Sequence, residues 1–225
     1  MIYARHHVHA ACCCRLVRQC CRCDDEGMDQ SAGIPSRRNF DPSAAKTYVA
    51  LLRGINVGGK NKLPMSDLAK MFTEAGCTDV RTYIQSGNVV FSVAPKSAKR
   101  VPDLVSRRIA DRFGYRIPVV LRTADEFRQV ATSNPFLKSH TNVDSLHVGF
   151  LADLPAPRDV AALDPNRSPG DSFKVRGREV YLCLPNGMAR TKLTNAYFDS
   201  KLATTSTFRN WRTLLKLLEM IQATG

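Results

Sequence analysis

The sequence contains little cysteine, histidine and tryptophan beyond its first residues, and it has no long apolar run. No stretch approaches the ~20 consecutive apolar residues that a membrane-spanning helix requires, so we expect no membrane partner. Six of the eight cysteines lie between Cys12 and Cys23, and only Cys77 and Cys183 follow them. The main part of the chain therefore has no disulfide framework, which predicts a reducing, cytoplasmic location.

Acidic side chains are also scarce relative to basic ones. The chain carries 20 acidic and 33 basic residues, a net charge of +13, and from Thr47 onward 15 acidic residues face 26 basic ones. Such an excess favours an anionic partner, either nucleic acid, a phosphorylated small molecule or an acidic protein. The alternative interpretation is a proteome whose proteins are basic in general.

Signals for catalysis or for a metal ion are poor. From Thr47 onward the histidines are His140 and His147 alone, and His147 lies within an apolar run with no nucleophile to pair with it. No pair of carboxylates and no metal-ligand spacing is present, so the catalytic residues and the cofactor are unknown and we expect no metal. Asp199 and Glu179 are weak candidates for a catalytic acid or base.

Residues 1–46 differ from the rest of the chain, because they show no sustained hydrophobic period. Three interpretations compete for them. Cys12–Cys14 and Cys20–Cys23 could bind a metal together with a histidine, but the spacing lacks the two separated knuckles of a zinc site. The basic, acid-free start could be a transit peptide. We favour a disordered or mis-assigned leader, with Met28 as the true start.

From Thr47 the hydrophobic periods predict a βαββαβα unit over residues 47–136. The expected strands are Tyr48–Arg53, Val80–Gln85, Asn88–Val93 and Ile117–Arg122, with helices near residues 63–75, 101–113 and 124–131. Ser86-Gly87 is typical of a tight hairpin turn.

The same order recurs over residues 144–225. The expected strands are Leu146–Leu151, Ser172–Val175, Glu179–Leu184 and Thr207–Asn210, with helices at Arg158–Leu163, Lys192–Leu202 and Trp211–Gln222. In both units a strand that ends in arginine runs into a helix. We therefore predict an α+β protein with two ferredoxin-like (βαββαβ) plaits in tandem, each an antiparallel sheet with helices on one face.

Four segments carry a resemblance to a known family. They are TYVALLRGINVGGKN at Thr47–Asn61, TYIQSGNVVF at Thr82–Phe91, LPNGMARTK at Leu184–Lys192 and TFRNWRTLLK at Thr207–Lys216. Together they resemble the domain-of-unknown-function 1697 family, a mostly bacterial group, over about residues 47 to 222. The resemblance implies the two-plait architecture and brings no established activity.

The corner that follows the first strand is the first candidate binding site. It lacks the Ser/Thr of a Walker A loop and the glycine spacing of a dinucleotide-binding loop. Its glycines can still turn backbone amides toward one anion, with polar side chains beside them. The candidate ligand-binding residues here are Arg53, Asn56, Gly58, Gly59, Lys60 and Asn61. The alternative is a loop that only needs positive φ.

Two later segments complete the candidate site. Arg190 and Lys192 stand near an expected helix start, where cations are unfavourable unless an anion joins them. Arg209 lies near the end of the last strand, two residues before Trp211, which heads an apolar stripe and is more typical of a core residue. We predict a protein that binds nucleic acid or a phosphorylated small molecule through these arginines and lysines. An enzyme that uses the same corners and a protein-interaction module are the alternatives, and the oligomeric state is not predicted.

Removal of the leader should barely change stability, because residues 1–46 have no apolar period from which to build a core. A shortened chain that begins at Ser43 should melt within ~2 °C of the full chain. A drop beyond ~8 °C, or zinc released stoichiometrically from the full chain, would contradict this interpretation.

Overall fold

The computed structural model describes residues 44–138 and 142–223. Asp41–Gly225 form one compact unit. Residues 1–43 of the predicted leader and His140 lie outside the described residues, so the expectations for them stay predictions.

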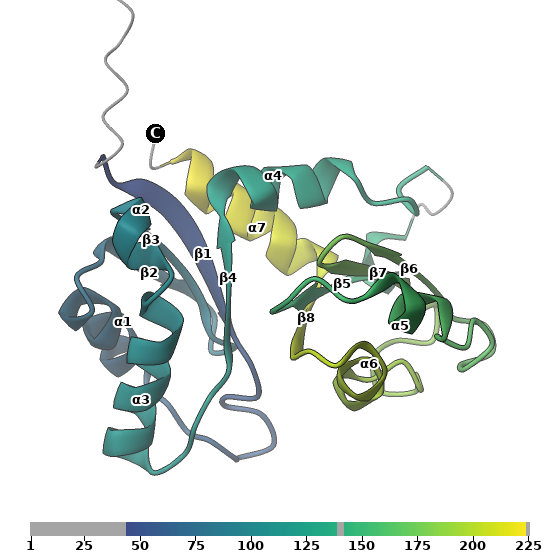
Figure 1. Cartoon of the computed structure of the whole chain (residues 1–225), viewed down its shortest axis with the longest axis horizontal. Helices are drawn as coiled ribbons and strands as arrows, with labels where there is room; N and C mark the ends of the chain where they lie inside the picture. Colours follow the sequence, from purple (N-terminus) through teal and green to yellow (C-terminus); the bar gives the residue numbers. More distant parts are fainter. Residues whose placement is uncertain (1–43, 139–141, 224–225) are drawn as a thin grey trace, which may run out of the picture. The chain divides into compact units, whose positions relative to one another are not determined.

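Two four-stranded antiparallel sheets form the framework (Figure 1). The first has the strand order β2-β3-β1-β4 and the second the order β6-β7-β5-β8. The strands of the first sheet are β1 (Lys46–Leu52), β2 (Thr78–Tyr83), β3 (Asn88–Val93) and β4 (Val119–Thr123). Those of the second are β5 (Leu146–Leu151), β6 (Ser172–Arg176), β7 (Glu179–Cys183) and β8 (Ser206–Asn210). The predicted mixture of helices with antiparallel sheets is confirmed.

The six predicted helices are present with shifted bounds. Those in the first half are α1 (Met65–Glu74), α2 (Pro95–Ala98), α3 (Val101–Phe113) and α4 (Ala124–Thr132). Those in the second half are the 3-10 turn η1 (Val143–Ser145), α5 (Pro157–Ala161), α6 (Asn195–Leu202) and α7 (Trp211–Gln222). The two short elements α2 and η1 were not predicted.

Strand β1 is apolar on both of its faces, and it separates two cores. Its side chains alternate between the faces of the sheet, as they must in a strand. Tyr48, Ala50 and Leu52 enter the core that α1 and α3 cover. Val49 and Leu51 enter a second core on the opposite face. The run is therefore nearly continuous in apolar residues because neither face of this strand meets water.

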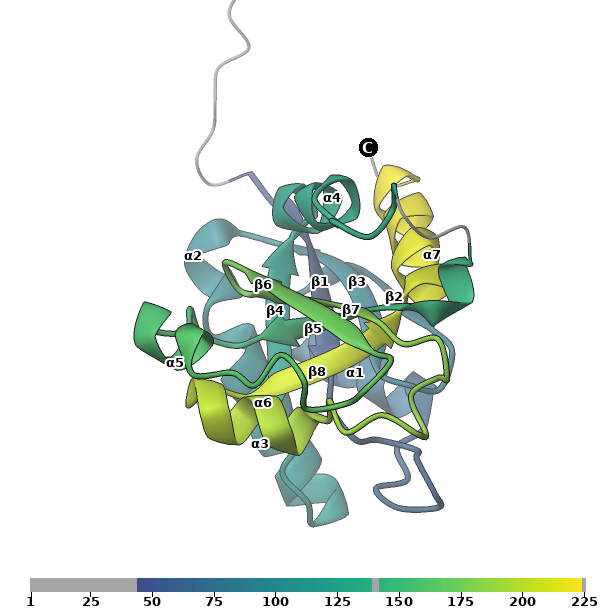
Figure 2. The same ribbon diagram turned by 90° about the vertical axis from the view of Figure 1, so that its right-hand side faces the viewer.

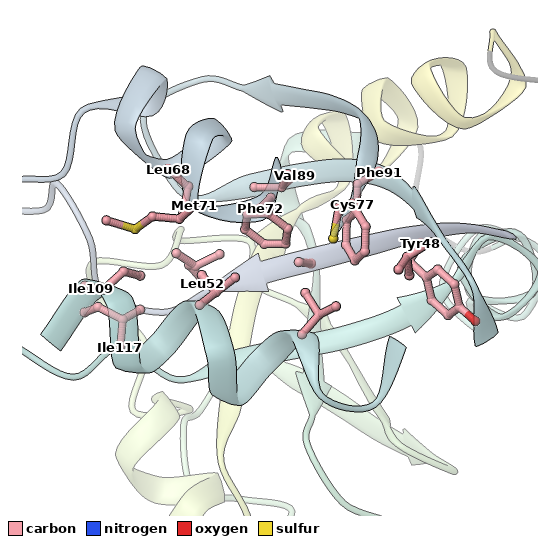
Figure 3. Close-up of a cluster of buried hydrophobic side chains, with 14 of the residues drawn as sticks. Tyr48, Leu52, Leu68, Met71, Phe72, Cys77, Val89, Phe91, Ile109 and Ile117 are labelled. Carbon is pink, nitrogen blue, oxygen red and sulfur yellow. The ribbon is translucent and has the colours of Figure 1, made fainter. Parts of the chain in front are cut away.

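The core under α1 and α3 is built from large side chains (Figure 3). Phe72 of α1 and Phe91 of β3 pack with their ring centroids 5.0 Å apart. Cys77 is buried beside them as a free thiol, as its sequence context predicts for a small core residue.

The expectation of helices on one face of each sheet is wrong for this fold. Helices α4 and α7 lie side by side (Figure 2) and share one core with residues of both sheets. Phe127 of α4 stacks on Phe150 of β5, and Trp211 of α7 is buried in the same core. The last helix of each half thus covers the face that α1 and α3, or α6, leave open. The apolar period of one helix cannot say which face of which sheet it covers.

Two local expectations also need correction. Tyr83 pairs with Asn88, so four residues join β2 to β3 rather than the predicted Ser86-Gly87 pair. Helix α6 begins at Asn195, where the Thr194 side chain accepts a hydrogen bond from the Tyr197 amide. Lys192 therefore precedes the helix cap, and the argument from an unfavourable helix dipole does not hold for it.

The two halves are joined by two buried arginines, one from the last strand of each half. Arg122 of β4 is 1% exposed and reaches the second half. Its Nη2 donates to the carbonyls of Leu151 (2.7 Å) and Arg178 (3.0 Å), and its Nε donates to Glu179 Oε1 (2.9 Å). One guanidinium therefore satisfies the carbonyls where β5 and the β6–β7 hairpin end.

Arg209 of β8 makes the reciprocal contacts with the first half. Its Nη2 donates to the carbonyls of Leu52 (2.7 Å) and Gly87 (3.3 Å), and its Nε donates to Asn88 Oδ1. We call Arg122 and Arg209 the arginine clasp.

The two halves of the clasp correspond residue by residue. Leu51 pairs with Asn88 in the first sheet, and Phe150 pairs with Glu179 in the second, so Asn88 and Glu179 occupy equivalent positions. The amides of Leu52 and Leu151 likewise donate to the carbonyls of Gly87 and Arg178. The repeated strand–arginine–helix pattern of the sequence therefore marks the contact between the two sheets.

Replacement of Arg122 by methionine should destabilise the protein by about 3–5 kcal/mol, because it leaves the Glu179 carboxylate and the Leu151 carbonyl without the Arg122 donor. The midpoint of denaturant unfolding measures the loss. Arg128→Ala is the matched control, since Arg128 forms only an exposed pair with Asp125 and should leave the midpoint almost unchanged. A loss below about 1 kcal/mol for Arg122→Met would show that the clasp is dispensable.

Candidate functional site

The clearest candidate site is a cavity of about 470 Å³ at the ends of β1 and β8. Its lining comes from the first corner (Leu52, Arg53, Gly54, Ile55 and Val57), from Ser86, His147, Met188 and Asn195, and from the end of β8 (Thr207, Phe208, Arg209 and Asn210). We call it the Arg53 cleft. It brings together Arg53 and Arg209 of the nine predicted ligand-binding residues.

Arg53 follows the last residue of β1 and is 30% exposed along its side chain. Its guanidinium donates to Asp199 of α6, on the other half of the chain. The second oxygen of Asp199 accepts from the Ser206 amide and the Ser206 hydroxyl, at 2.7 Å each. Asp199, a weak candidate for catalysis in the sequence, is thus a partner that orients Arg53.

Arg209 lines the same cleft from a buried position. All of its hydrogen-bond acceptors are neutral oxygens: the Asn88 amide, the Thr207 hydroxyl and the carbonyls of Leu52, Ser86, Gly87 and Phe208. No carboxylate among the described residues forms an ion pair with it. Burial lowers the pKa of Arg209 to about 10, so it still carries its charge at neutral pH. The cleft therefore adjoins a buried cation that has no ionic partner.

The equivalent arginine on the other side of the molecule is compensated. Arg122 donates to Glu179, where Arg209 donates to Asn88. Burial lowers the pKa of Arg122, and the neighbouring Glu179 carboxylate opposes that shift. The difference between an amide and a carboxylate at one position therefore makes the two ends of the clasp electrostatically unequal.

His147 of β5 also lines the Arg53 cleft. Its Nδ1 lies 3.3 Å from the Ser145 carbonyl, and burial lowers the pKa of the imidazole below its usual range. His147 is therefore neutral at pH 7. Its sequence context gave no sign of a site, because nothing in an apolar strand indicates what the strand end will face.

The remaining residues of the first corner mostly shape their own loop. Asn56 donates to the carbonyls of Leu63 and Gln85, and Asn61 donates to the carbonyl of Gly54. Both asparagines adopt positive φ, 54° and 49°. Gly58, Gly59 and Lys60 form an exposed turn. None of these five residues lines the cleft, although Val57 between them does.

The second predicted corner contributes a residue that the sequence did not single out. Arg190 and Lys192 are exposed and do not line the cleft, whereas Met188 of the same loop does. Glu179, the other weak catalytic candidate, forms the ion pair with Arg122 at 2.9 Å. Neither carboxylate suggested by the sequence therefore lies free beside the cleft.

Two other cavities differ from the Arg53 cleft in charge. A cavity of about 730 Å³, which we call the Tyr48 cleft, lies at the corresponding ends of β4 and β5. Basic and acidic side chains both line it: Lys99, Arg178, Glu126 and Asp153. A third cavity of about 390 Å³ lies beside α4, and the Arg178–Glu126 pair (2.5 Å) forms part of its wall. The Arg53 cleft, by contrast, has two arginines and no carboxylate in its lining.

Two kinds of feature are absent from the described residues. Over residues 44–138 and 142–223, no group of three or more histidine, cysteine, aspartate or glutamate side chains is placed to hold a metal ion. Within the same ranges, no helix has the length and apolar character needed to cross a membrane.

Comparison with known proteins identifies the family of the chain. A comparison with functionally curated proteins gives no match. The structure is similar to that of the conserved bacterial protein SP0830 from Streptococcus pneumoniae, with a TM-score of 0.61 and 23% sequence identity over 79% of this chain and 99% of that chain. At this identity the likeness shows the fold alone. The model of the family described as "Protein of unknown function (DUF1697)" matches residues 45–181, more than half of the chain, and the chain therefore belongs to this family.

Proposed function

We propose that the protein binds a small anionic ligand in the Arg53 cleft. The observation that carries the proposal is the buried charge of Arg209, which lines the cleft and has only neutral hydrogen-bond partners. Arg53 adds a second guanidinium on the same lining, and Asp199 holds it in place.

The physical reason lies in the cost of a buried charge. A cation taken out of water is stabilised partly by carbonyl dipoles, and an anion nearby would stabilise it further. Guanidinium groups also bind phosphate and carboxylate through charge-assisted, often bidentate hydrogen bonds. An anion in this cleft would therefore lie near two guanidinium groups: Arg53, which Asp199 holds in place, and Arg209, whose charge has no ionic partner among the described residues.

The form of the site favours a small molecule over nucleic acid. A concave cavity of this volume is typical of small-molecule sites. Nucleic acid would instead need an extended basic surface, for which α3 is the candidate. Arg108 and Arg112 of α3 are already paired, with Glu74 (3.6 Å) and Asp67 (2.9 Å).

We further infer that each half is a ferredoxin-like plait and that the chain is an internal duplication. The equal strand orders of the two sheets and the equivalent contacts of Arg122 and Arg209 support this inference. We assign the protein to the cytoplasm, in keeping with the free, buried thiols of Cys77 and Cys183.

Anion affinity should rise as the pH falls. Burial lowers the pKa of His147, so its ring is neutral at pH 7 and gains its charge only at a lower pH than an ordinary histidine. A bound anion favours the charged ring, and by linkage the charged ring favours the anion. Sulfate, whose own charge is constant here, should bind more tightly at about pH 5.5 than at about pH 7.5 in calorimetric titrations. His147→Gln should remove the trend, and an unchanged trend in that variant would exclude His147 as its source.

Replacement of Arg53 by glutamine should weaken the binding of pyrophosphate about 10- to 150-fold, the range expected for a lost hydrogen bond to a charged group. Calorimetric titration measures the affinity, and a thermal melt confirms the fold. Because the variant leaves Asp199 without its cationic partner, Arg53→Gln combined with Asp199→Asn separates the loss of the Arg53 charge from the gain of an uncompensated carboxylate.

The matched control is Lys99→Gln, which removes the same charge from the lining of the Tyr48 cleft. It should leave pyrophosphate affinity within about twofold, a change typical of surface charges. Equal losses in Arg53→Gln and Lys99→Gln would indicate attraction by net charge alone. That result, or a wild-type protein that binds no anion, would overturn the proposal.

A further inference from the structure

We propose that the ligand of the Arg53 cleft carries an apolar body as well as its anionic group, so that Val57 and Met188 bind the body while the arginines bind the charge. This inference rests on the proposed function, and it names the chemical class: a small phosphate monoester or carboxylic acid with an aromatic or acyl part.

The first support is the exposure of two apolar side chains at this cleft. Among the described residues six large hydrophobic side chains are exposed, and two of them, Val57 (65%) and Met188 (37%), line this one cavity. When a ligand covers exposed apolar surface, the removal of that surface from water lowers the free energy of the complex. Ile55 and Phe208 add further apolar groups to the lining of the same cavity.

The second support is the way the first corner holds Val57. The Lys60 amide donates to the Val57 carbonyl (3.1 Å), and the two residues form an isolated β-bridge. Asn56 and Asn61 fix the loop on either side through their bonds to Gln85 and Gly54. The asparagine side chains of the loop therefore bond backbone carbonyls, and the residue of the loop that faces the cavity beside the turn is the apolar Val57.

This arrangement explains why the predicted polar contacts do not reach the cleft. Gly58 and Gly59, at φ 58° and 75°, allow the turn that follows Val57. The glycines and asparagines of the corner thus pre-organise a hydrophobic contact, and a pre-organised contact costs less entropy when the ligand binds.

The third support is the separation of chemistry along the lining. The charge comes from Arg53 and Arg209, the apolar contacts come from Ile55, Val57, Met188 and Phe208, and His147 is neutral. Small-molecule sites are typically apolar with a few convergent polar groups, which is the composition found here. Inorganic phosphate would use only the charged part.

Methyl phosphate and phenyl phosphate test the inference, because they carry the same anionic group on bodies of different size. The full chain should bind phenyl phosphate at least about tenfold more tightly, the gain expected for covering a ring. In the double variant Val57→Ser, Met188→Gln this preference should fall below about threefold, while the affinity for methyl phosphate stays the same. Both side chains are exposed, so neither change should disturb the fold.

Leu154→Ser is the control, because Leu154 is 71% exposed and lies outside the cleft lining. It should keep the full preference for phenyl phosphate. Equal affinities of the wild-type chain for the two esters would overturn this inference, and pyrophosphate binding that depends on Arg53 would then leave the proposed function intact. A preference that survives the double variant would also overturn it. Failure of the wild-type chain to bind pyrophosphate and both esters would overturn the proposed function and this inference together.

Discussion

The structure depends on two arginine side chains, each of which reaches from its own half of the chain into the other half. Arg122 satisfies carbonyls at the end of β5 and the neighbouring hairpin, and Arg209 does the same at the end of β1. Each arginine completes hydrogen bonding that its partner half cannot complete alone, and a buried carbonyl without a donor is costly. The shared core of α4 and α7 adds apolar burial to this polar contact.

The arginine clasp also determines where the molecule carries an uncompensated buried charge, because the acceptors of Arg122 and Arg209 differ at one equivalent position. Glu179 forms an ion pair with Arg122, whereas Asn88 accepts a hydrogen bond from Arg209 with a neutral amide oxygen that does not compensate its charge. The amide of Asn88 therefore leaves the buried charge of Arg209 without an ionic partner among the described residues, and the proposed anion site rests on this difference. The cleft with the uncompensated arginine is also the one lined by Arg53 and by the exposed tips Val57 and Met188.

Much of the fold could be predicted from the sequence, because period and turn chemistry are local properties. Patterns in the sequence indicated the apolar run of β1, the hairpin near Gly87 and the apolar stripes of α3 and α7. The site was visible only in part. Arg209 stands 157 residues from the Leu52 carbonyl that it binds, and Arg53 stands 146 residues from Asp199. Nothing local distinguishes a buried arginine from an exposed one at a strand end, nor shows that Asn56 bonds its own loop while Val57 faces the cleft.

The reciprocity of the clasp has a consequence for the origin of the protein. In a two-fold symmetric dimer, each contact from one subunit to its partner occurs a second time in reverse. Arg122 and Arg209 follow that rule within one chain. On the proposed duplication, the equivalent assembly of two separate chains would be a homodimer with two identical clefts. A single chain does not impose that symmetry, and positions 88 and 179 hold different residues, so that only one of the two described arginines of the clasp lacks an ionic partner.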